Sequence, residues 1–158
     1  MNQIIIFCAA NLIYISVFYV LIKVIFKRDK KDYLIKILIV LISGVVAWVV
    51  AHILKGVIAH PRPDLTNSLI TPDATYSFPS GHATFMFALA FAMYHFDKYA
   101  GKIIFILAVL TGISRVLAGV HFWYDIFGGF ILGSVVSFLL LQIVKRLIRK
   151  TSVQVLIP

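Results

Sequence analysis

The chain has 158 residues, of which 61% are hydrophobic and 13% are charged, and its mean hydropathy is +1.00. Soluble domains are about half apolar and about a quarter charged, so this composition excludes an ordinary soluble domain and predicts one polytopic membrane domain over residues 1–158. The formal net charge of +9 also suggests a nucleic-acid-binding protein, and the positions of the basic residues decide between the two classes.

Five hydrophobic segments follow one another along the chain, and each predicts a membrane helix. They are Ile4–Phe26, Leu34–Leu54, Ser80–Phe96, Ile103–Ala118 and Phe122–Val144. At a rise of about 1.5 Å per residue, a helix needs about 20 residues to span the bilayer, and roughly 17 are tolerated. The first, second and fifth segments meet this length, whereas the third and fourth span only if their polar ends reach the interface. The sequence therefore predicts an all-α bundle of five transmembrane helices.

Two features inside these segments support that prediction. No basic residue precedes the first segment and no clear small-residue cleavage site follows it, so a retained helix is expected rather than a signal peptide. Small residues in the fourth and fifth segments are expected to let helices pack closely. They are Gly112, Gly128, Gly129 and Gly133.

Twelve of the fifteen basic residues fall on one side of a five-helix chain. They surround the first connection, flank the third and form the C-terminal tail: Lys23, Lys27, Arg28, Lys30, Lys31, Lys36, Lys98, Lys102, Lys145, Arg146, Arg149 and Lys150. Because cytoplasmic loops carry an excess of lysine and arginine, the N-terminus is predicted to lie outside and the C-terminus in the cytoplasm, as in a multi-pass plasma-membrane protein. The basic tail then needs no partner beyond anionic lipid, and no nucleic-acid partner is expected.

The other three basic residues, Lys55, Arg62 and Arg115, fall on the outer side, where topology gives no reason for positive charge. One explanation is that they snorkel to the interface or pair with Asp64 and Asp73. The other explanation is a bound anion. Three cations that all oppose the topological trend favour the anion.

The predicted topology brings polar residues from distant parts of the chain to the outer interface. They are Lys55, Arg62, Ser80, Gly81, His82, Arg115, His121 and Asp125. A helix N-terminus presents free N–H groups to an anion, and arginine and lysine side chains bind phosphate oxygens. This set of residues therefore predicts a phosphate-binding site.

His121 and Asp125 are four residues apart and are expected to share one helix face. A carboxylate beside an imidazole fixes its tautomer and supports a phosphorylated form, which leaves His82 as a proton donor. The alternatives are that Ser80 is only an N-cap and that the His–Asp pair is a structural hydrogen bond. The chain contains no glutamate and no spacing typical of a zinc site, so no metal or cofactor is predicted. The remaining histidines are expected to be interface or packing residues: His52, His60 and His95.

Three segments together resemble the signature of the type 2 phosphatidic acid phosphatase superfamily: KGVIAHPRP, PSGH and SRVLAGVHFWYD. The family pattern is Lys, six residues, Arg-Pro; then Pro-Ser-Gly-His; then Ser-Arg, five residues, His, three residues, Asp. The chain matches every fixed position between residues 55 and 125. Many membrane members of this family have six helices, whereas five are expected here.

The resemblance implies a role for each matched residue. His121 would be the nucleophile that forms a phosphohistidine, Asp125 would orient it, and His82 would protonate the departing oxygen. The phosphoryl oxygens would be held by Lys55, Arg62, Ser80, Gly81 and Arg115. These fixed cations and N–H groups would neutralise the charge of the transition state without a metal.

The resemblance also implies an integral membrane phosphatase that acts on a lipid phosphate or diphosphate at the outer interface. Undecaprenyl diphosphate is the predicted substrate, because three cations suit a highly charged headgroup and the loops other than His60–Pro79 are short. The alternatives are a phosphatase of phosphatidylglycerophosphate, phosphatidic acid or lipid A, and a lipid phosphotransferase. A non-catalytic anion- or lipid-binding membrane protein is a third class, which the complete acid and nucleophile set disfavours. Nothing in the pattern indicates an oligomeric state.

Overall fold

The computed structural model describes residues 2–26, 29–72 and 74–154, and all regular elements in these ranges are helical. The elements are α1 (Asn2–Ile22), α2 (Lys30–Ile58), the 3-10 turn η1 (Leu65–Asn67), α3 (Gly81–Phe96), α4 (Lys98–Leu117) and α5 (Trp123–Gln154). The prediction of an all-α bundle of five helices is confirmed, whereas the five membrane spans and their orientation stay predictions. Three residues of the predicted charge pattern, Lys27, Arg28 and Asp73, lie outside the described residues.

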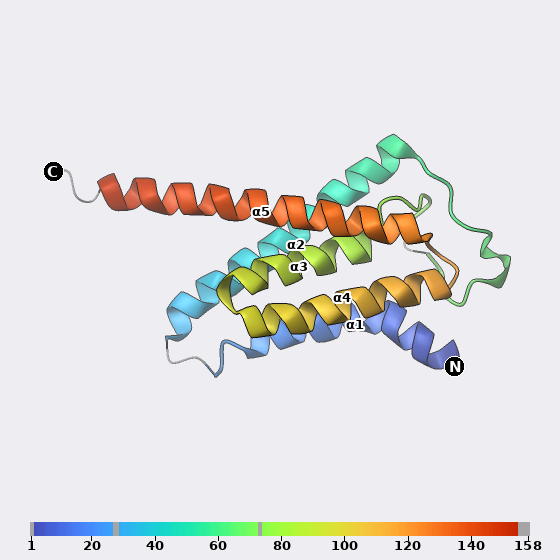
Figure 1. The fold of residues 1–158 in the computed structure, drawn as a ribbon, viewed down its shortest axis with the longest axis horizontal. Coiled ribbons are helices and arrows are strands. Elements are labelled where there is room, and N and C mark those ends of the chain that lie inside the picture. The colour runs from blue at the N-terminus through green and yellow to red at the C-terminus, as the bar shows by residue number, and fades with distance from the viewer. Residues whose placement is uncertain (1, 27–28, 73, 155–158) are drawn as a thin grey trace.

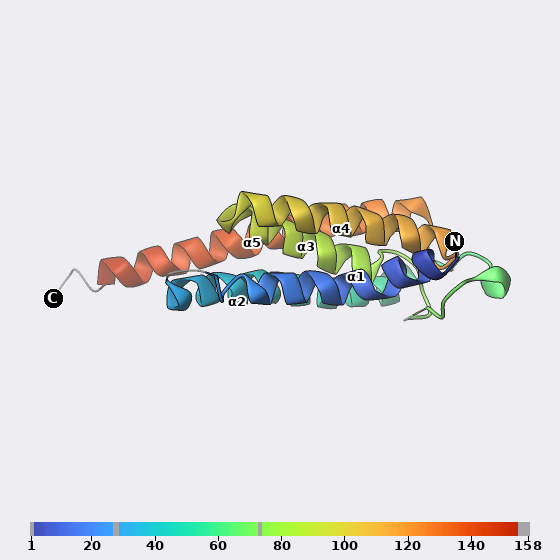
Figure 2. The same cartoon turned by 90° about the horizontal axis from the view of Figure 1, so that it is seen from below.

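Helix α3 lies at the centre of the bundle and packs against α2, α4 and α5. Helices α1 and α2 form one layer, and α3, α4 and α5 lie over it (Figure 2). Helix α1 packs mainly on α4, and α2 also contacts α5. The buried core is therefore built around α3, most of whose residues are buried.

Four of the five helices are long and apolar enough to cross a membrane: α1, α2, α4 and residues Trp123–Leu147 of α5. Helix α3 has only 16 residues. At about 1.5 Å per residue it is about 24 Å long, which is less than the roughly 30 Å hydrocarbon core. The chain is thus a multi-pass membrane protein, and its short helix is the one enclosed by the others.

Most helices extend further at their polar ends than the hydrophobic segments predict. Helices α2 and α4 begin earlier because Asp29 and Asp97 cap them: the two carboxylates accept hydrogen bonds from the backbone N–H groups of Asp32 and Ala100, each at 3.0 Å. Helix α2 also continues far enough to include Lys55 in its last turn. Helix α1 ends at Ile22 and α4 at Leu117, both earlier than predicted, so hydropathy located the helices but not their boundaries.

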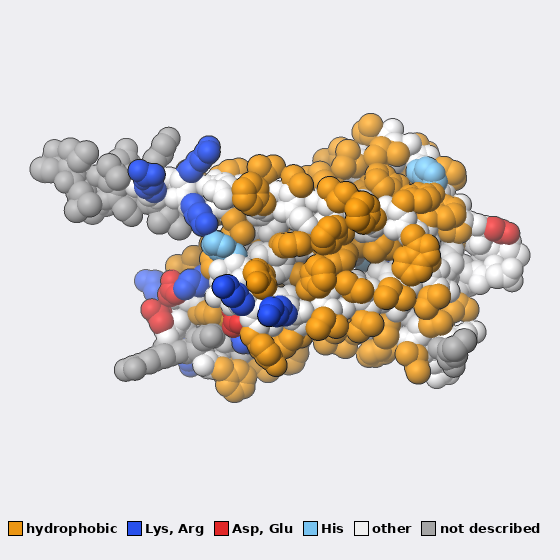
Figure 3. All heavy atoms as spheres, viewed as in Figure 1, with side chains coloured by type: hydrophobic (Ala, Val, Ile, Leu, Met, Phe, Trp, Pro, Cys, Tyr) orange, Lys and Arg blue, Asp and Glu red, His pale blue; other side chains and the backbone are white. Residues whose placement is uncertain are grey.

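The two groups of basic residues lie at opposite ends of the bundle. Residues 59–80 and 118–122 form loops at the end where α1 begins, and the other two connections lie at the end from which the C-terminal part of α5 projects (Figure 1). Lysine and arginine side chains gather at this second end (Figure 3). The Lys23 ammonium lies 3.0 Å from the Asp97 carboxylate there and ties the α1–α2 connection to the α3–α4 connection.

Glycines bring the start of α5 close to α3. A Cβ atom on Gly133 would lie 2.5 Å from the carbonyl oxygen of Thr84, which is closer than any side chain tolerates. At all four glycines predicted to serve packing, an added Cβ would lie within 2.9 Å of another segment, so that prediction is confirmed. The same contact sets the register between α3 and α5, where the backbone N–H of Ser80 donates to the carbonyl oxygen of Asp125 at 3.1 Å.

The loop over residues 59–80 is fastened at its base and exposed at its tip. The backbone N–H of Ser77 donates to the carbonyl oxygen of His60 at 2.9 Å, and the Arg62 Nε donates to the carbonyl oxygen of Ala74 at 2.7 Å. The backbone N–H of Leu69 also donates to the carbonyl oxygen of Ala118 at 2.9 Å, and this bond holds the part of the loop that follows η1. Between these anchors, residues 64–67 are exposed and contain the turn η1.

Candidate active site

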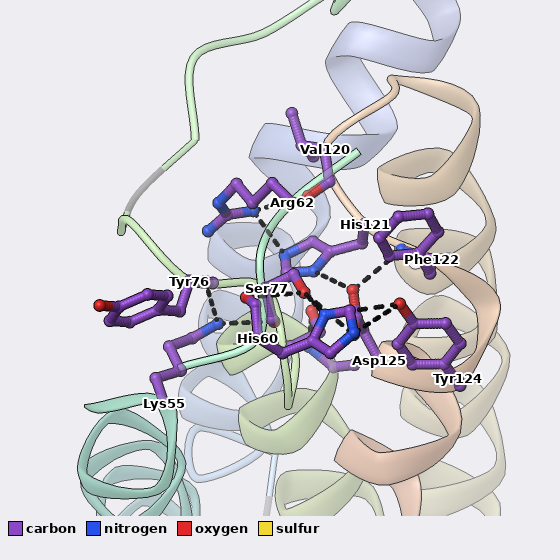
Figure 4. Close-up of polar contacts among 12 residues, drawn as sticks. Lys55, His60, Arg62, Tyr76, Ser77, Val120, His121, Phe122, Tyr124 and Asp125 are labelled. Atoms are coloured by element: carbon purple, nitrogen blue, oxygen red, sulfur yellow. Dashed lines mark hydrogen bonds and ion pairs between the residues drawn. The ribbon is translucent and has the colours of Figure 1, made fainter. Parts of the chain in front are cut away.

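His121 and Asp125 form a buried pair where the loop after α4 meets α5. His121 is 2% exposed and Asp125 is fully buried. The His121 Nδ1 lies 3.1 Å from Oδ2 of Asp125, and the same oxygen accepts a hydrogen bond from the backbone N–H of Phe122 at 2.9 Å (Figure 4). The predicted contact between the two side chains is confirmed, but the predicted shared helix face is wrong, because His121 precedes the first residue of α5.

Arg62 determines which nitrogen of His121 carries the hydrogen. Its Nη1 lies 3.4 Å from Nε2 of His121. A guanidinium can only donate, so Nε2 accepts and carries a lone pair. The hydrogen is therefore on Nδ1, which donates it to Asp125. This tautomer leaves the lone pair of the ring on Nε2.

The surroundings keep His121 neutral. Burial is the main cause that holds the pKa of His121 below its usual value of 6.5, and the positive charges of Arg115, Arg62 and Lys55 lower the pKa further. The hydrogen bond to Asp125 acts in the opposite direction and is outweighed. At neutral pH the imidazole is therefore uncharged.

Backbone carbonyl groups orient two of the cations in the site. Lys55 is almost fully buried, and its Nζ donates to the carbonyl oxygens of Ser77 at 2.8 Å and of Tyr76 at 3.1 Å. The Arg62 Nη1 donates to the carbonyl oxygen of Val120 at 2.6 Å. Each cation comes from a different part of the chain and is fixed to a loop that carries another part of the site (Figure 4).

A cavity of about 300 Å³ opens beside these residues. Five of the eight predicted site residues line it: Lys55, Arg62, Gly81, His82 and His121. The N-terminus of α3 meets the cavity at Gly81, where the N–H groups of the first turn and the helix dipole attract an anion. Ile13 and Trp48 add an apolar part to the wall from α1 and α2. The cavity thus combines fixed positive groups with a surface suited to a hydrocarbon chain.

The other three predicted residues lie behind or beside this cavity. Asp125 lies behind His121, and Ser80 caps α3, its hydroxyl oxygen 3.5 Å from the backbone nitrogen of Ala83. Arg115 is 2% exposed and lines a second cavity of about 370 Å³. The two cavities share His82, so the imidazole lies at their junction. The structure gathers all eight residues at one end of the bundle, and the catalytic and phosphate-binding roles of all eight stay predictions.

Three residues of the site escaped the sequence analysis. His52 and His60 were expected to be packing or interface residues, but His52 lines the first cavity and the His60 Nδ1 lies 3.1 Å from the Ser77 hydroxyl. His52 could have been found, because it precedes Lys55 by three residues and lies on the same helix face. No spacing identifies Ser77, which lies in a loop.

Within residues 2–26, 29–72 and 74–154, no three His, Cys, Asp or Glu side chains gather as a metal site requires.

The sequence model of the PAP2 superfamily matches residues 32–149, a range that contains all eight predicted site residues. The chain belongs to the PAP2 superfamily. An undecaprenyl-diphosphatase from Sulfolobus acidocaldarius is 41% identical over 124 residues, which cover 75% of this chain and 58% of that protein. The chain spans about half the length of the curated relatives it matches.

Two solved structures share the PAP2 architecture of this chain. LpxE from Aquifex aeolicus superposes with a TM-score of 0.68 and 28% identity, over 90% of this chain and 87% of that one. A PAP2-type phosphatidylglycerolphosphate phosphatase from Bacillus subtilis superposes with a TM-score of 0.66 and 27% identity, over 92% of this chain and 77% of that one. The resemblance inferred from the three sequence motifs is confirmed at the level of the family and of the fold.

Proposed function

We propose that this PAP2 protein is an integral membrane phosphatase that hydrolyses a lipid phosphate or diphosphate through a phosphohistidine. One observation carries the proposal: the buried pair of His121 and Asp125, whose hydrogen bond leaves the Nε2 lone pair beside Arg62 at the wall of the cavity. Binding an anion requires no neutral histidine with an oriented lone pair. A nucleophile requires both.

The reaction has two steps. First, Nε2 of His121 attacks phosphorus, and the N–P bond forms as the P–O bond to the leaving group breaks. His82 donates a proton to that departing oxygen. Then a water molecule attacks the phosphohistidine, His82 takes the proton from the water, and the N–P bond breaks to release inorganic phosphate. In both steps Asp125 stabilises the positive charge that the imidazole acquires.

Charge stabilisation comes from groups that the chain holds in place. Lys55 and Arg62 face the transferred phosphoryl group, and the N-terminal N–H groups of α3 at Gly81 add to them. Donors fixed in advance stabilise a transition state without reorganising when the charge develops. In this proposal Arg115 and the Ser80 hydroxyl complete the set, and no metal takes part.

Undecaprenyl diphosphate is the proposed preferred substrate. The relative from Sulfolobus acidocaldarius, at 41% identity, is named for this substrate. The second cavity adjoins the first at His82 and carries Arg115, which supplies room and positive charge for the phosphate that leaves with the lipid. The apolar wall formed by Ile13 and Trp48 suits a tail that stays in the bilayer.

The competing substrates also have support. The structural neighbours include a phosphatidylglycerolphosphate phosphatase and LpxE, so glycerolipid and lipid A phosphates belong in the same assay. A lipid phosphotransferase shares the first chemical step and differs only in its acceptor. A lipid alcohol added to the assay separates the two activities, since a transferase yields a new lipid phosphate in place of inorganic phosphate.

The test is phosphate release by the purified full-length protein in detergent, with His121→Ala as the control. We expect kcat/KM to be highest for undecaprenyl diphosphate among that lipid, phosphatidylglycerophosphate, phosphatidic acid and lipid A. If another lipid is preferred about tenfold, which is about 1.4 kcal/mol of transition-state binding, the isoprenoid assignment is wrong and the phosphatase assignment stands. No release from any of the four lipids contradicts the phosphatase itself.

We further propose that the site faces the outside of the plasma membrane. The support is the gathering of basic side chains at the opposite end of the bundle. On a Cys8→Ser background, cysteines introduced at Asn67 or Ser68 should react with an impermeant thiol reagent in intact cells, whereas Asp29→Cys should not. Labelling of Asp29→Cys alone contradicts this orientation.

A further inference from the structure

Ser77 contacts the oxygen of Asp125 that His121 does not use. Its side chain is fully buried, and its hydroxyl lies 3.4 Å from Oδ1 of Asp125 (Figure 4). Oδ2 has two donors, the ring of His121 and the backbone N–H of Phe122. In the described part of the chain, Oδ1 has no donor other than Ser77. A buried carboxylate oxygen without a donor is costly, so Asp125 needs the Ser77 hydrogen.

Two other acceptors lie within reach of the Ser77 hydroxyl, the carbonyl oxygens of Pro61 at 2.9 Å and of His60 at 3.4 Å. Both have another donor. The His60 carbonyl accepts from the backbone N–H of Ser77 at 2.9 Å, and the Pro61 carbonyl lies 2.8 Å from Nδ1 of His60. Both are also neutral, whereas the Asp125 carboxylate forms the stronger, charge-assisted bond. The hydroxyl hydrogen therefore goes to Asp125.

This assignment fixes the tautomer of His60. The Ser77 oxygen is left to accept from Nδ1 of His60, 3.1 Å away, so that nitrogen carries the hydrogen and shares it with the Pro61 carbonyl. The His60 Nε2 then carries a lone pair and accepts from the Tyr124 hydroxyl at 3.3 Å. Each group in the series gives one hydrogen to the next, from Tyr124 through His60 and Ser77 to Asp125.

We propose that Tyr124, His60 and Ser77 form a positioning chain that holds the Asp125 carboxylate and, through it, fixes His121 with Nε2 as the nucleophilic atom. None of the three lines the first cavity, so they act through Asp125 and not on the substrate. Without the hydrogen bond from Ser77 to Oδ1, Asp125 has donors on Oδ2 alone. Its carboxylate can then rotate and weaken the hydrogen bond to His121. The kinetic consequences rest on the proposed phosphatase function, whereas the tautomers do not.

The first experiment reads the tautomers without any turnover. Full-length protein labelled with 15N-histidine is studied by NMR in detergent, and spectra of His60→Asn and His121→Ala assign the two signals. Both rings should carry hydrogen on Nδ1 and a lone pair on Nε2, which is the less common form of a free imidazole. A wild-type His60 protonated on Nε2 alone overturns the positioning chain.

The second experiment separates kcat from KM. Ser77→Ala should lower kcat about ten- to a hundredfold with KM changed less than about twofold, because the chain orients the nucleophile and touches no substrate. His60→Leu should have a similar effect. His60→Asn keeps an N–H near the position of Nδ1 and should restore kcat to within about threefold of the wild type. The double variant Ser77→Ala/His60→Leu should be no slower than Ser77→Ala, since the two residues act in series.

Ser43→Ala is the matched control for the loss of a buried hydroxyl. Ser43 is also fully buried, and its hydroxyl donates to the carbonyl oxygen of Ile39 at 2.8 Å within α2. This variant should lose thermal stability comparably to Ser77→Ala and keep its kcat. The positioning chain is refuted if Ser77→Ala keeps kcat within about twofold, if His60→Asn is as slow as His60→Leu, or if the double variant multiplies the single effects. A wild type that releases no phosphate refutes the phosphatase instead, and the NMR spectra still decide the tautomers.

Discussion

Positive side chains gather at both ends of the bundle, and the two ends hold them in opposite ways. At the end from which α5 projects, Lys98, Lys102 and Lys145 are exposed. At the other end, Lys55 is 5% exposed and Arg115 is 2% exposed. An exposed cation contributes little beyond favouring the cytoplasmic side, whereas a buried cation costs several kcal/mol unless an anion compensates for it. The two groups of cations carry the same charge and differ in burial. Burial therefore distinguishes the cations of the candidate site from the cations that indicate membrane topology.

The hydrogen-bond partners of the two groups differ in the same way. At the exposed end, Lys36 pairs with Asp32 one turn earlier on the same helix. At the buried end, carbonyl groups from distant segments fix Lys55 and Arg62. A carbonyl oxygen orients a cation and does not itself neutralise the positive charge. The comparison predicts that changes at the buried end affect catalysis and that matched changes at the exposed end do not.

The largest effect is expected at the nucleophile. His121→Ala should lower kcat by several orders of magnitude, because no N–P bond can form without the ring, and Lys145→Ala should leave kcat unchanged. Phosphate release measures both variants, and acid-labile labelling of the protein by a 32P-substrate should occur in the wild type and disappear in His121→Ala. Labelling that persists in His121→Ala assigns the nucleophile to another residue.

The next effect is expected at the buried lysine. Lys55→Met keeps the length of the side chain but removes its charge, and should lower kcat/KM about a hundredfold. It should also destabilise the protein by about 1–3 kcal/mol, because two buried carbonyl groups lose their donor. Lys102→Met, at the exposed end, is the control and should change neither quantity. Equal effects of the two substitutions would remove the distinction between the two ends.

The smallest effect is a shift along the pH axis. Burial and the three cations lower the pKa of His121 more than Asp125 raises it, so the folded protein binds this proton only below 6.5, the ordinary value. The contribution to stability is fully present above pH 6.5 and is lost as the pH falls toward the folded pKa. Removing one of the cations with Arg62→Gln should raise the pKa of His121. A titration of the His121 NMR signal measures the shift, with Lys102→Gln as the unshifted control.

The sequence predicts the helices and the convergence of the motifs, because both follow from long apolar runs and from charge asymmetry. It does not predict the helix boundaries. The capping carboxylates of Asp29 and Asp97 extend α2 and α4 into polar sequence that a hydropathy average assigns to loops. The sequence indicates that the third segment is short for a bilayer span, but it does not predict that α3 lies at the centre of the bundle.

The site residues that the sequence misses depend on contacts between distant segments. Ser77 meets Asp125 across 48 positions, and His60 meets Tyr124 across 64. The register of these contacts is set by the glycine packing between α3 and α5 and by the backbone bonds at the base of the loop. Neither the glycine packing nor the backbone bonds of the loop can be predicted from the periodicity of one helix. Ser77, in a loop, and His60, beside a proline, therefore show no sequence pattern that identifies them as site residues.

Hydrogen bonds at the two ends of the loop over residues 59–80 should allow its exposed segment, residues 64–67, to be exchanged. The bonds from Ser77 to His60 and from Arg62 to Ala74 close the loop below the tip, and the Leu69 backbone holds it on the other side. A graft that exchanges residues 64–67 for the matching segment of another PAP2 protein should therefore leave the residues of the candidate site in register. Such chimaeras offer a way to change the preference for a lipid headgroup without changing the proposed catalytic residues.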